Sequence, residues 1–300
     1  MTILRQKLGL SPIALVTGCS SGIGLCVAKG LRESGWRVFA TARSVASVSE
    51  LVEQGFEALQ LDVADSDSIR RCVAEILLLT GGRLDALFNN AGFGVPGAVE
   101  DLTREAMRYQ FETNVFGAIE LTNAVLPVMR QQGYGTILFN SSVLGFAAMP
   151  YRGAYNASKF ALEGFVDTLR QELYGTKIDV CLIEPGPIVS EFRANAAKQF
   201  SQWVDPSRSF HAKSYYQMSL RLEKQGSVAP FTLPAEAVFK VVGRALAAKK
   251  PKVRYRVTIP TQVFWYLKRL LPSKCLDRVL LLASGDEPGV SYGRNPARRS

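Results

Sequence analysis

Histidine is scarce and cysteine is scattered in this sequence of 300 residues. The one histidine, His211, excludes a histidine-rich metal site, and the five cysteines form no Cys-x-x-Cys pair. Zinc ribbons and thioredoxin-like redox motifs are therefore excluded, and we expect no bound metal. An odd number of unclustered cysteines is typical of reduced thiols in a cytoplasmic protein, where each is a small buried side chain.

Long apolar runs are also lacking. The N-terminus shows neither the apolar core nor the small-residue cleavage site of a signal peptide. The longest span without charge, Gln131–Tyr151, contains Asn140, two serines, three glycines and Pro150. Such residues make a poor transmembrane helix, so we expect a buried strand followed by a loop.

Basic residues exceed acidic ones, 36 against 26, but the excess is unevenly placed. Residues 249–300 hold 12 Lys and Arg against three Asp and Glu, a net charge of +9. The first 248 residues hold the remaining 24 and 23, a net charge of +1. This nearly neutral body, without an aromatic and basic platform, argues against nucleic-acid binding.

Short β-rich apolar runs alternate with helical patterns along the chain. The expected strands are residues 13–17, 37–41, 58–62, 84–88, 135–139, 178–183 and 253–258. The clearest helical patterns are residues 23–34, 66–80, 104–129, 155–174 and 234–248. Strands separated by helices form βαβ crossovers, with helices on both faces of one sheet. The sequence therefore predicts an α/β protein with a three-layer Rossmann fold, whose doubly wound, mostly parallel sheet has seven strands.

The first expected strand ends in a glycine-rich loop. Gly18, Gly22 and Gly24 follow the spacing Gly-x3-Gly-x-Gly. Between the glycines lie Cys19, Ser20, Ser21 and Ile23. Glycines let the backbone approach a pyrophosphate closely, and the next helix offers its N-terminal N–H groups to that anion. The strand-loop-helix context therefore predicts a dinucleotide site.

The second expected strand indicates which dinucleotide binds. An NAD site usually carries an acidic residue after this strand, which hydrogen-bonds the ribose 2′-hydroxyl. Here the strand ends in Ala42-Arg43, and no acid occurs before Glu50. Arg43 can pair with a 2′-phosphate and Ser20 can add a hydrogen bond, so we expect NADP. Asp62, after the third strand, can accept a hydrogen bond from the adenine amino group.

Ser142, Tyr155 and Lys159 form the most specific chemical pattern in the chain. Tyr and Lys four residues apart share one face of a helix. A free phenol has a pKa near ~10, and a nearby ammonium is expected to lower it toward the range of a useful acid or base. Ser142 ends the fifth strand beside the same crevice, where its hydroxyl can hold a carbonyl oxygen. Ser141 is the neighbouring alternative.

With these motifs the sequence resembles the short-chain dehydrogenases/reductases over residues 13–190. The matching motifs are Thr17–Gly24, Asp62-Val63, Asn89-Asn90-Ala91-Gly92, Asn114, Ser142, Tyr155, Lys159 and Pro185-Gly186. The resemblance implies carbonyl or alcohol chemistry linked to NAD(P). It implies that Tyr155 moves the proton, Lys159 lowers the pKa of Tyr155 and holds the nicotinamide ribose, and Ser142 steadies the carbonyl. Asn114 would support a proton-relay water.

The same resemblance implies a set of cofactor contacts. These are Gly18, Ser20, Ser21, Gly22, Ile23, Gly24, Arg43, Asp62, Val63, Asn90, Ala91, Gly92, Tyr155, Lys159, Pro185, Gly186, Ile188 and Ser190. One position departs from the family pattern, which usually has a threonine shortly after Pro-Gly to bind the nicotinamide carboxamide. Ser190 keeps a hydroxyl there.

Within the family the chain is similar to bacterial NADP-dependent aldehyde reductases and to retinol and 17β-hydroxysteroid dehydrogenases. We therefore expect hydride transfer between NADP(H) and an apolar aldehyde or ketone, or the corresponding alcohol. Five residues could line an apolar pocket: Phe93, Phe146, Met149, Phe192 and Trp203. The alternatives are reduction of an acyl chain on a carrier protein, steroid or retinol oxidoreduction, and NADPH sensing without turnover. Intact Ser142, Tyr155 and Lys159 argue against a sensor.

Three segments complete the expected organisation. Residues 1–260 are expected to form a single NADP-binding catalytic domain. The irregular stretch 187–233 follows the sixth strand, where ligands bind in open α/β sheets, so we expect a substrate lid; a peripheral helical pair is the alternative. Residues 261–300 form a basic amphipathic extension, which could touch an anionic membrane or pack on the domain or a second subunit. We expect a homo-oligomer and a disordered end over 285–300.

Overall fold

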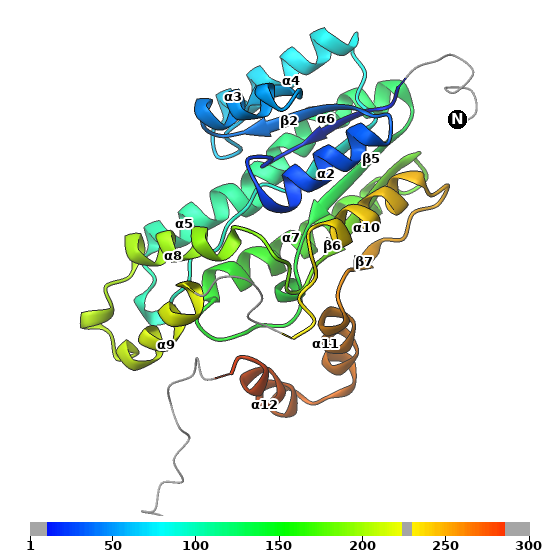
Figure 1. Ribbon diagram of the computed structural model, residues 1–300. Helices are drawn as coiled ribbons and strands as arrows, with labels where there is room; N and C mark the ends of the chain where they lie inside the picture. Colours follow the sequence, from blue (N-terminus) through cyan, green and yellow to red (C-terminus); the bar gives the residue numbers. More distant parts are fainter. Residues whose placement is uncertain (1–10, 224–229, 286–300) are drawn as a thin grey trace, which may run out of the picture.

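The computed structural model describes residues 11–223 and 230–285 and contains one seven-stranded sheet (Figure 1). The strands are β1 (Ile13–Val16), β2 (Arg37–Ala42), β3 (Glu57–Gln60), β4 (Ala86–Asn89), β5 (Gly135–Asn140), β6 (Ile178–Glu184) and β7 (Arg254–Arg256). Their order is β3-β2-β1-β4-β5-β6-β7, and every neighbouring pair is parallel. The predicted fold is confirmed. The expected disorder after residue 285 lies outside the described residues.

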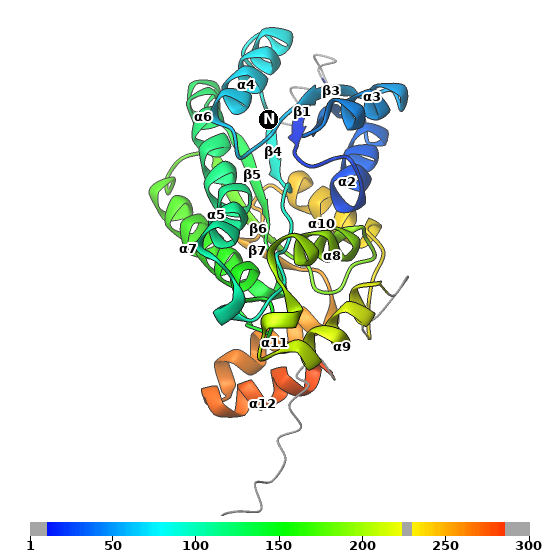
Figure 2. The ribbon, with the colours of Figure 1, turned by 90° about the vertical axis from the view of Figure 1, so that its left-hand side faces the viewer.

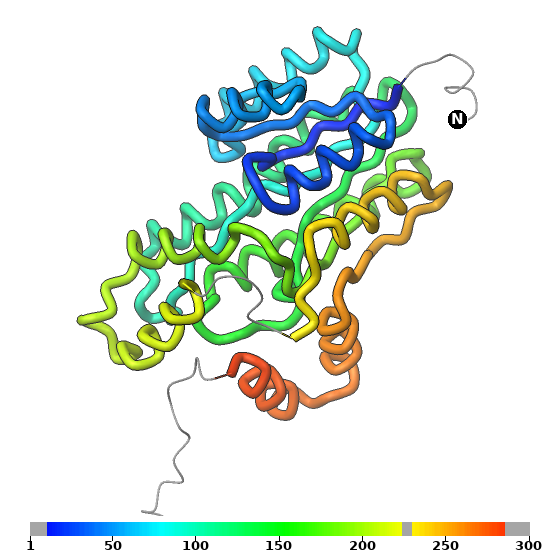
Figure 3. Tube along the Cα trace, in the orientation of Figure 1, coloured from blue at the N-terminus to red at the C-terminus, as the bar shows by residue number. Residues whose placement is uncertain are grey.

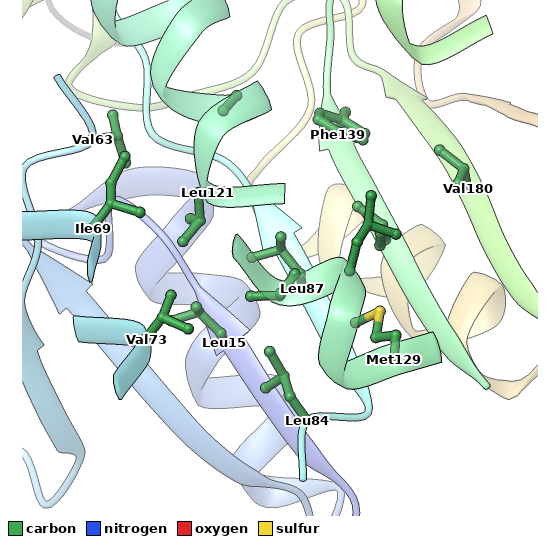
Figure 4. Packing of buried hydrophobic residues seen from close by; sticks show 14 of the residues in the cluster. Leu15, Val63, Ile69, Val73, Leu84, Leu87, Leu121, Met129, Phe139 and Val180 are labelled. Carbon is green, nitrogen blue, oxygen red and sulfur yellow. The ribbon is translucent and has the colours of Figure 1, made fainter. Parts of the chain in front are cut away.

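Helices cover both faces of the sheet, as Figure 2 shows. One face is covered by α4 (Ser66–Thr80), α5 (Arg104–Phe111), α6 (Ala118–Gln132) and α7 (Gly153–Glu172), and the other by α2 (Gly22–Glu33), α3 (Val45–Glu53) and α10 (Glu236–Ala247). On the first of these faces, residues of α4 and α6 such as Ile69 and Leu121 pack against strand residues such as Leu15 and Leu87 (Figure 4). The central strands β1 and β4 are buried along their whole length, which explains their continuous apolar sequence.

Local sequence sets the ends of these helices. Ser44, Asp65 and Thr103 are N-caps whose side-chain oxygens accept backbone N–H groups of the first turns of α3, α4 and α5. Gly81 and Gly133 end α4 and α6 in the left-handed region, with φ of 63° and 75°. After α3, α4 and α6 the chain enters β3, β4 and β5, each parallel to its neighbours in the sheet (Figure 3).

The helix predicted over residues 104–129 is divided in the structure. Between α5 and α6 the segment η2 (Glu112–Gly117) is a π-helix. At its end, a Cβ on Gly117 would overlap the backbone carbonyl of Val63, so the loop after β3 presses directly on this helix. π-Helical turns occur frequently at functional sites. Here the turn carries the buried Asn114, one of the residues predicted to act in the site.

The predicted insertion is ordered over its described part. It contains α8 (Phe192–Trp203), the short helix η4 (Pro206–Arg208) and α9 (Ala212–Glu223), and a parallel bridge from Ile188 to Leu233 joins its two ends. Tyr215 anchors α9 to η1 (Val99–Asp101), because its hydroxyl bonds the Asp101 carboxylate and accepts the Ala98 N–H at 2.9 Å. The structure therefore shows a helical pair attached to the domain; its action as a lid stays a prediction.

The described part of the C-terminal extension packs on the domain. After β7 come α11 (Ile259–Leu270) and α12 (Ser273–Ala283), at the end of the molecule opposite α4 (Figures 1 and 2). Leu280 is buried against Val143, Leu144 and Ala147, around the short helix η3 (Val143–Gly145). Within residues 11–223 and 230–285, no helix combines the length and apolar character needed to span a membrane.

The contact between Gly117 and Val63 predicts a stability effect. We expect Gly117→Ala to lower the free energy of unfolding by about 1–3 kcal/mol, because the added methyl group overlaps the backbone and forces η2 to shift. Urea denaturation would measure the change. Gly164→Ala is the control, since Gly164 lies in α7 with no atom within 4 Å of the added Cβ. Equal stabilities of the two variants would contradict the prediction.

Candidate active site

The glycine loop forms a tight cradle at the carboxyl end of β1. Gly18 has a φ of +70°, and a Cβ on Gly24 would overlap the Gly18 carbonyl. The Asn90 amide donates from Nδ2 to the carbonyl oxygens of Thr17 and Gly18, at 2.8 and 3.2 Å. Thr17 Oγ1 in turn accepts the backbone N–H groups of Asn90 and Ala91, at 2.9 and 2.8 Å. Side chains at the two glycines would collide with Ala91 and with the Gly18 carbonyl, so the tight shape of this cradle requires glycine at both positions.

The start of α2 completes this cradle. Its N-cap is Ser21, whose side chain makes no capping hydrogen bond. The N–H groups of the first turn are therefore left to a ligand or to water, as in helix N-termini that bind phosphates. Ser190 lies across from this turn, because its Cβ is 3.2 Å from the position of a Cβ on Gly22. The residues present fit the diphosphate of a nicotinamide dinucleotide.

Arg43 and Asp62 lie beside the cradle, after β2 and β3. Arg43 donates from Nη1 to the Tyr109 hydroxyl at 3.3 Å, and this hydrogen bond raises the pKa of the guanidinium. Asp62 is close enough to act on the same pKa, and its Oδ1 accepts the Ala64 N–H at 3.0 Å. The structure thus brings a cation and an acid together at the edge of the sheet where an adenosine would lie.

Lys159 and Tyr155 meet on the first turns of α7. Lys159 Nζ donates to the Asn140 carbonyl at 2.6 Å and lies 5.7 Å from the centre of the Tyr155 ring. Tyr155 is hydrogen-bonded to Ser142, whose Oγ also accepts the Leu144 N–H at 3.1 Å. Ser142 is the N-cap of η3, so this short turn fixes its hydroxyl. The predicted trio of Ser142, Tyr155 and Lys159 is therefore assembled in space.

The protonation of this trio differs from the expectation. Burial raises the pKa of Tyr155 to about 12, and the hydrogen bond to Ser142 opposes that rise. Lys159 is not among the groups that act on this pKa, so the lowering expected from its ammonium is not found; the rise follows from removing the phenolate from water. Burial also lowers the pKa of Lys159 to about 8, and Glu163 opposes this change. At neutral pH the site therefore holds a protonated phenol beside an ammonium that is close to its own pKa.

Asn114 is fixed on every side by polar contacts. Its Nδ2 donates to the Phe93 carbonyl at 2.9 Å and to Ser158 Oγ at 3.1 Å, and its Oδ1 accepts the Phe93 N–H at 3.1 Å. Ser158 lies between Tyr155 and Lys159 on α7, so Asn114 links η2 and the loop after β4 to α7. A proton relay through Asn114 stays a prediction.

The segment after β6 closes another side of the site. The Pro185 carbonyl accepts the Val143 N–H at 2.8 Å, next to Ser142. A Cβ on Gly186 would overlap Thr258 Oγ1, so β6 and the start of α11 meet closely there. Ile188 forms the bridge to Leu233 at the base of the insertion.

The five expected pocket residues divide into two groups. The Phe192 ring is 5.3 Å from the Tyr155 ring, and Phe146 and Met149 belong to one apolar cluster with Tyr155. This cluster also contains Phe264 of α11 and Leu276 of α12. Phe93 and Trp203 instead pack on Tyr109, with ring centres 4.8 and 5.7 Å apart. The first group adjoins Tyr155, and the second contacts Tyr109, whose hydroxyl bonds Arg43.

Sequence reasoning missed a buried group of charges behind the catalytic helix. Glu163, on α7, accepts hydrogen bonds from Ser141 Oγ and, at 3.0 Å, from Arg254 Nη2. Glu184, fully buried at the end of β6, lies 3.1 Å from Arg254 Nε and 3.3 Å from Arg256 Nε. Burial raises the pKa of Glu184 to about 7. An acidic residue four positions after Lys159 was the signal available in the sequence.

Comparisons with known proteins agree with this geometry. The family model described as short chain dehydrogenase matches residues 12–200. The uncharacterized oxidoreductase YbbO of Escherichia coli (strain K12) is 41% identical over 266 residues, which cover 89% of this chain and 93% of YbbO. Retinol dehydrogenase 8 of Bos taurus is 34% identical, with 87% and 86% covered. The crystal structure of a short-chain dehydrogenase from Streptomyces avermitilis, 28% identical, superposes with a TM-score of 0.71 and covers 93% of this chain and 97% of its own.

The chain therefore belongs to the short-chain dehydrogenase/reductase family and is an oxidoreductase. The predicted resemblance is confirmed, and a nicotinamide cofactor is typical of such enzymes.

Proposed function

We propose that this enzyme transfers a hydride between NADP(H) and an apolar aldehyde or ketone, or the corresponding alcohol. The observation that carries the proposal is the assembly of Ser142, Tyr155 and Lys159 beside the apolar side chains of Phe146, Met149 and Phe192. When bound, the cofactor supplies or receives the hydride at the carbonyl carbon.

The chain's own residues supply the proton and the orientation. In the direction of reduction, the Tyr155 hydroxyl breaks its O–H bond and gives the proton to the carbonyl oxygen. Its raised pKa keeps it protonated for this step. Ser142 holds the same oxygen, and the Lys159 ammonium stabilises the negative charge that develops on Tyr155. Lys159 would also hold the ribose of the nicotinamide.

The preference for NADP rests on Arg43. It is the side chain that follows β2 directly, where an NAD site would place an acidic residue. Its bond to the Tyr109 hydroxyl holds the guanidinium at the edge of the cradle, where it can pair with a 2′-phosphate.

The apolar substrate class rests on the cluster around Tyr155. Retinol dehydrogenase 8, one of the relatives, is named for an apolar alcohol. Steroid or retinol oxidoreduction remains within this class. Reduction of an acyl chain on an acidic carrier protein is the second candidate, favoured by the basic C-terminal segment; a salt-sensitive KM confined to carrier-bound substrates would distinguish it.

The proton-transfer role of Tyr155 predicts a selective loss. We expect Tyr155→Phe to lower kcat by about a hundredfold to ten-thousandfold, because the phenyl ring has no proton to give. NADPH absorbance with a panel of aliphatic aldehydes, retinal and ketosteroids would measure turnover, and NADPH fluorescence would show unchanged cofactor binding. Tyr174→Phe is the matched control, since Tyr174 is almost fully exposed after α7. Retained turnover in Tyr155→Phe would reject the assignment.

The role of Arg43 predicts a change in cofactor choice. We expect Arg43→Asp to lower the ratio of kcat/KM for NADPH over NADH by about tenfold to a hundredfold, because the charge-assisted bonds to the 2′-phosphate are lost. Steady-state kinetics with both cofactors would give the ratio. Arg130→Asp, an exposed arginine in the last turn of α6, is the control. An unchanged ratio in Arg43→Asp would exclude the proposed contact.

A further inference from the structure

Glu163 occupies a buried position between the catalytic helix and the last strand. It lies one helical turn after Lys159 on α7, with a residue exposure of only 8%. One carboxylate oxygen accepts the Ser141 hydroxyl, and the other accepts Arg254 Nη2 of β7 at 3.0 Å. A carboxylate buried to this degree is costly unless it is paired, so its position calls for a physical reason.

We propose that Glu163 is a positioning residue, which holds Lys159 in its charged form and the Ser141-Ser142 turn in place. The proposal rests on the roles of Lys159 and Ser142 in the proposed function. Glu163 touches neither substrate nor cofactor; it acts through the groups on either side of it.

Close packing supports the link to Ser142. A Cβ on Gly145 would lie 2.7 Å from Ser141 Oγ and 3.0 Å from Glu163 Cγ, so the carboxylate packs directly under the turn η3. Ser142 is the N-cap of that turn, and Ser141 precedes it. The bond from Ser141 to Glu163 therefore fixes the backbone that carries the Ser142 hydroxyl.

Charge supports the link to Lys159. The charged groups that act on or around Glu163 are Lys159 and Asp167 of α7, Glu184 of β6, Arg254 of β7 and Lys268 of α11. Burial raises the pKa of Glu163, while Ser141 and Arg254 oppose that rise. The ion pair with Arg254, at 3.0 Å, favours the charged carboxylate. Burial lowers the pKa of Lys159 to about 8 and Glu163 opposes this. The ammonium is present below that pKa and is lost as the pH rises through it.

Removing the charge of Glu163 gives the test. We expect Glu163→Gln, which keeps the size of the side chain, to move the alkaline limb of the kcat profile for reduction to lower pH by about one pH unit. Asp167→Asn is the matched control, because Asp167 also pairs with Arg254 Nη2, at 2.6 Å, but does not bond Ser141. We expect its alkaline limb to stay at the wild-type position. An unmoved limb in Glu163→Gln, or an equal shift in both variants, would overturn the proposal.

Two further measurements test the proposal on Glu163 if the activity assay or the folding of Glu163→Gln fails. Nuclear magnetic resonance of isotope-labelled lysine side chains, assigned with Lys159→Arg, follows the Lys159 titration without any substrate. A failure of the proposed activity therefore leaves the proposal on Glu163 testable. If Glu163→Gln does not fold, Glu163→Asp retains the charge: an alkaline limb at the wild-type position supports the proposal, and a displaced limb contradicts it.

A separate observation concerns the outer face of α11. Ile259, Val263, Tyr266 and Leu270 follow one another at spacings of four, three and four residues, and all four are exposed, Leu270 to 75%. These positions share one side of the helix, opposite the buried Thr261. Leu282 of α12 is exposed to 82% at the same end of the molecule (Figures 1 and 2).

The charges beside this apolar row have one sign. Residues 257–285 contain four cations against the single acid Asp277. Lys268 turns inward over the Phe160 ring of α7, 4.6 Å from its centre, whereas Arg269, Lys274 and Arg278 are exposed. A second copy seated on the row by two-fold symmetry would place like charges against each other, which weakens association. An anionic lipid surface instead accepts both the apolar row and the cations. From this complementarity we infer that α11 and α12 dock on an anionic membrane surface.

Docking of α11 and α12 on a membrane would place the lipid next to the apolar cluster around Tyr155. The inner faces of α11 and α12, through Phe264 and Leu276, contact the same apolar cluster as Tyr155. One face of the pair therefore meets the lipid while the other borders the place where an apolar carbonyl compound would react. The inference rests on the proposed substrate class only for this consequence, since the docking itself needs no turnover.

Sedimentation with vesicles tests the docking. We expect the protein to bind vesicles of phosphatidylserine and phosphatidylcholine, but not of phosphatidylcholine alone, and to release them at high salt. Tyr266→Ser with Leu270→Ser should weaken binding about tenfold. Leu78→Ser, which removes an exposed leucine of α4 at the opposite end, should leave it unchanged. The inference is overturned if the protein does not bind the anionic vesicles. It is also overturned if the protein binds no vesicles but forms a dimer in solution that the α11 variant loses.

Discussion

One chain of hydrogen bonds joins the glycine cradle after β1 to Lys159 of α7. The Lys159 ammonium donates to the Asn140 carbonyl, the Asn140 side chain donates to Asn90 Oδ1, and Asn90 Nδ2 donates to the carbonyls of Thr17 and Gly18. Its links come from the ends of β1, β4 and β5 and from α7. Because parallel strands bring their carboxyl ends to one edge, residues more than a hundred positions apart in sequence are held in one rigid frame.

Much of this frame could be predicted because its signals are local. The glycine loop, the Tyr-x3-Lys spacing and the alternation of strands and helices each depend on backbone geometry within a few residues. The division of the helix at η2 could not be predicted from the local pattern, and the contact beside it, between Gly117 and Val63, joins segments far apart in the sequence. The ion pairs of Glu163 and Glu184 were missed for the same reason, since their partners Arg254 and Arg256 arrive from a strand 70 to 91 residues later.

The same ion pairs change the interpretation of the basic C-terminal segment. From the sequence, the +9 charge of residues 249–300 is separate from a neutral body. In the structure Arg254 and Arg256 belong to the sheet and balance acids buried behind the site. Arg256 also stacks on Trp265 of α11, 3.8 Å from the ring centre. Part of the basic excess is therefore internal. Among the described residues of this segment, the exposed cations are Lys249, Lys250 and Lys252 before β7 and those of α11 and α12.

Burial acts in opposite directions on the two titrating groups of the site. It raises the pKa of Tyr155 because the phenolate is the charged form, and it lowers the pKa of Lys159 because the ammonium is. Together the two shifts favour a neutral phenol beside a neutral amine. A neutral Lys159 could not stabilise the negative charge that the proposed reduction leaves on Tyr155. Among the causes that act on Lys159, Glu163 alone raises its pKa. A low-dielectric site of this kind thus needs a fixed anion behind the lysine, and β7 supplies the arginine that makes such an anion stable there.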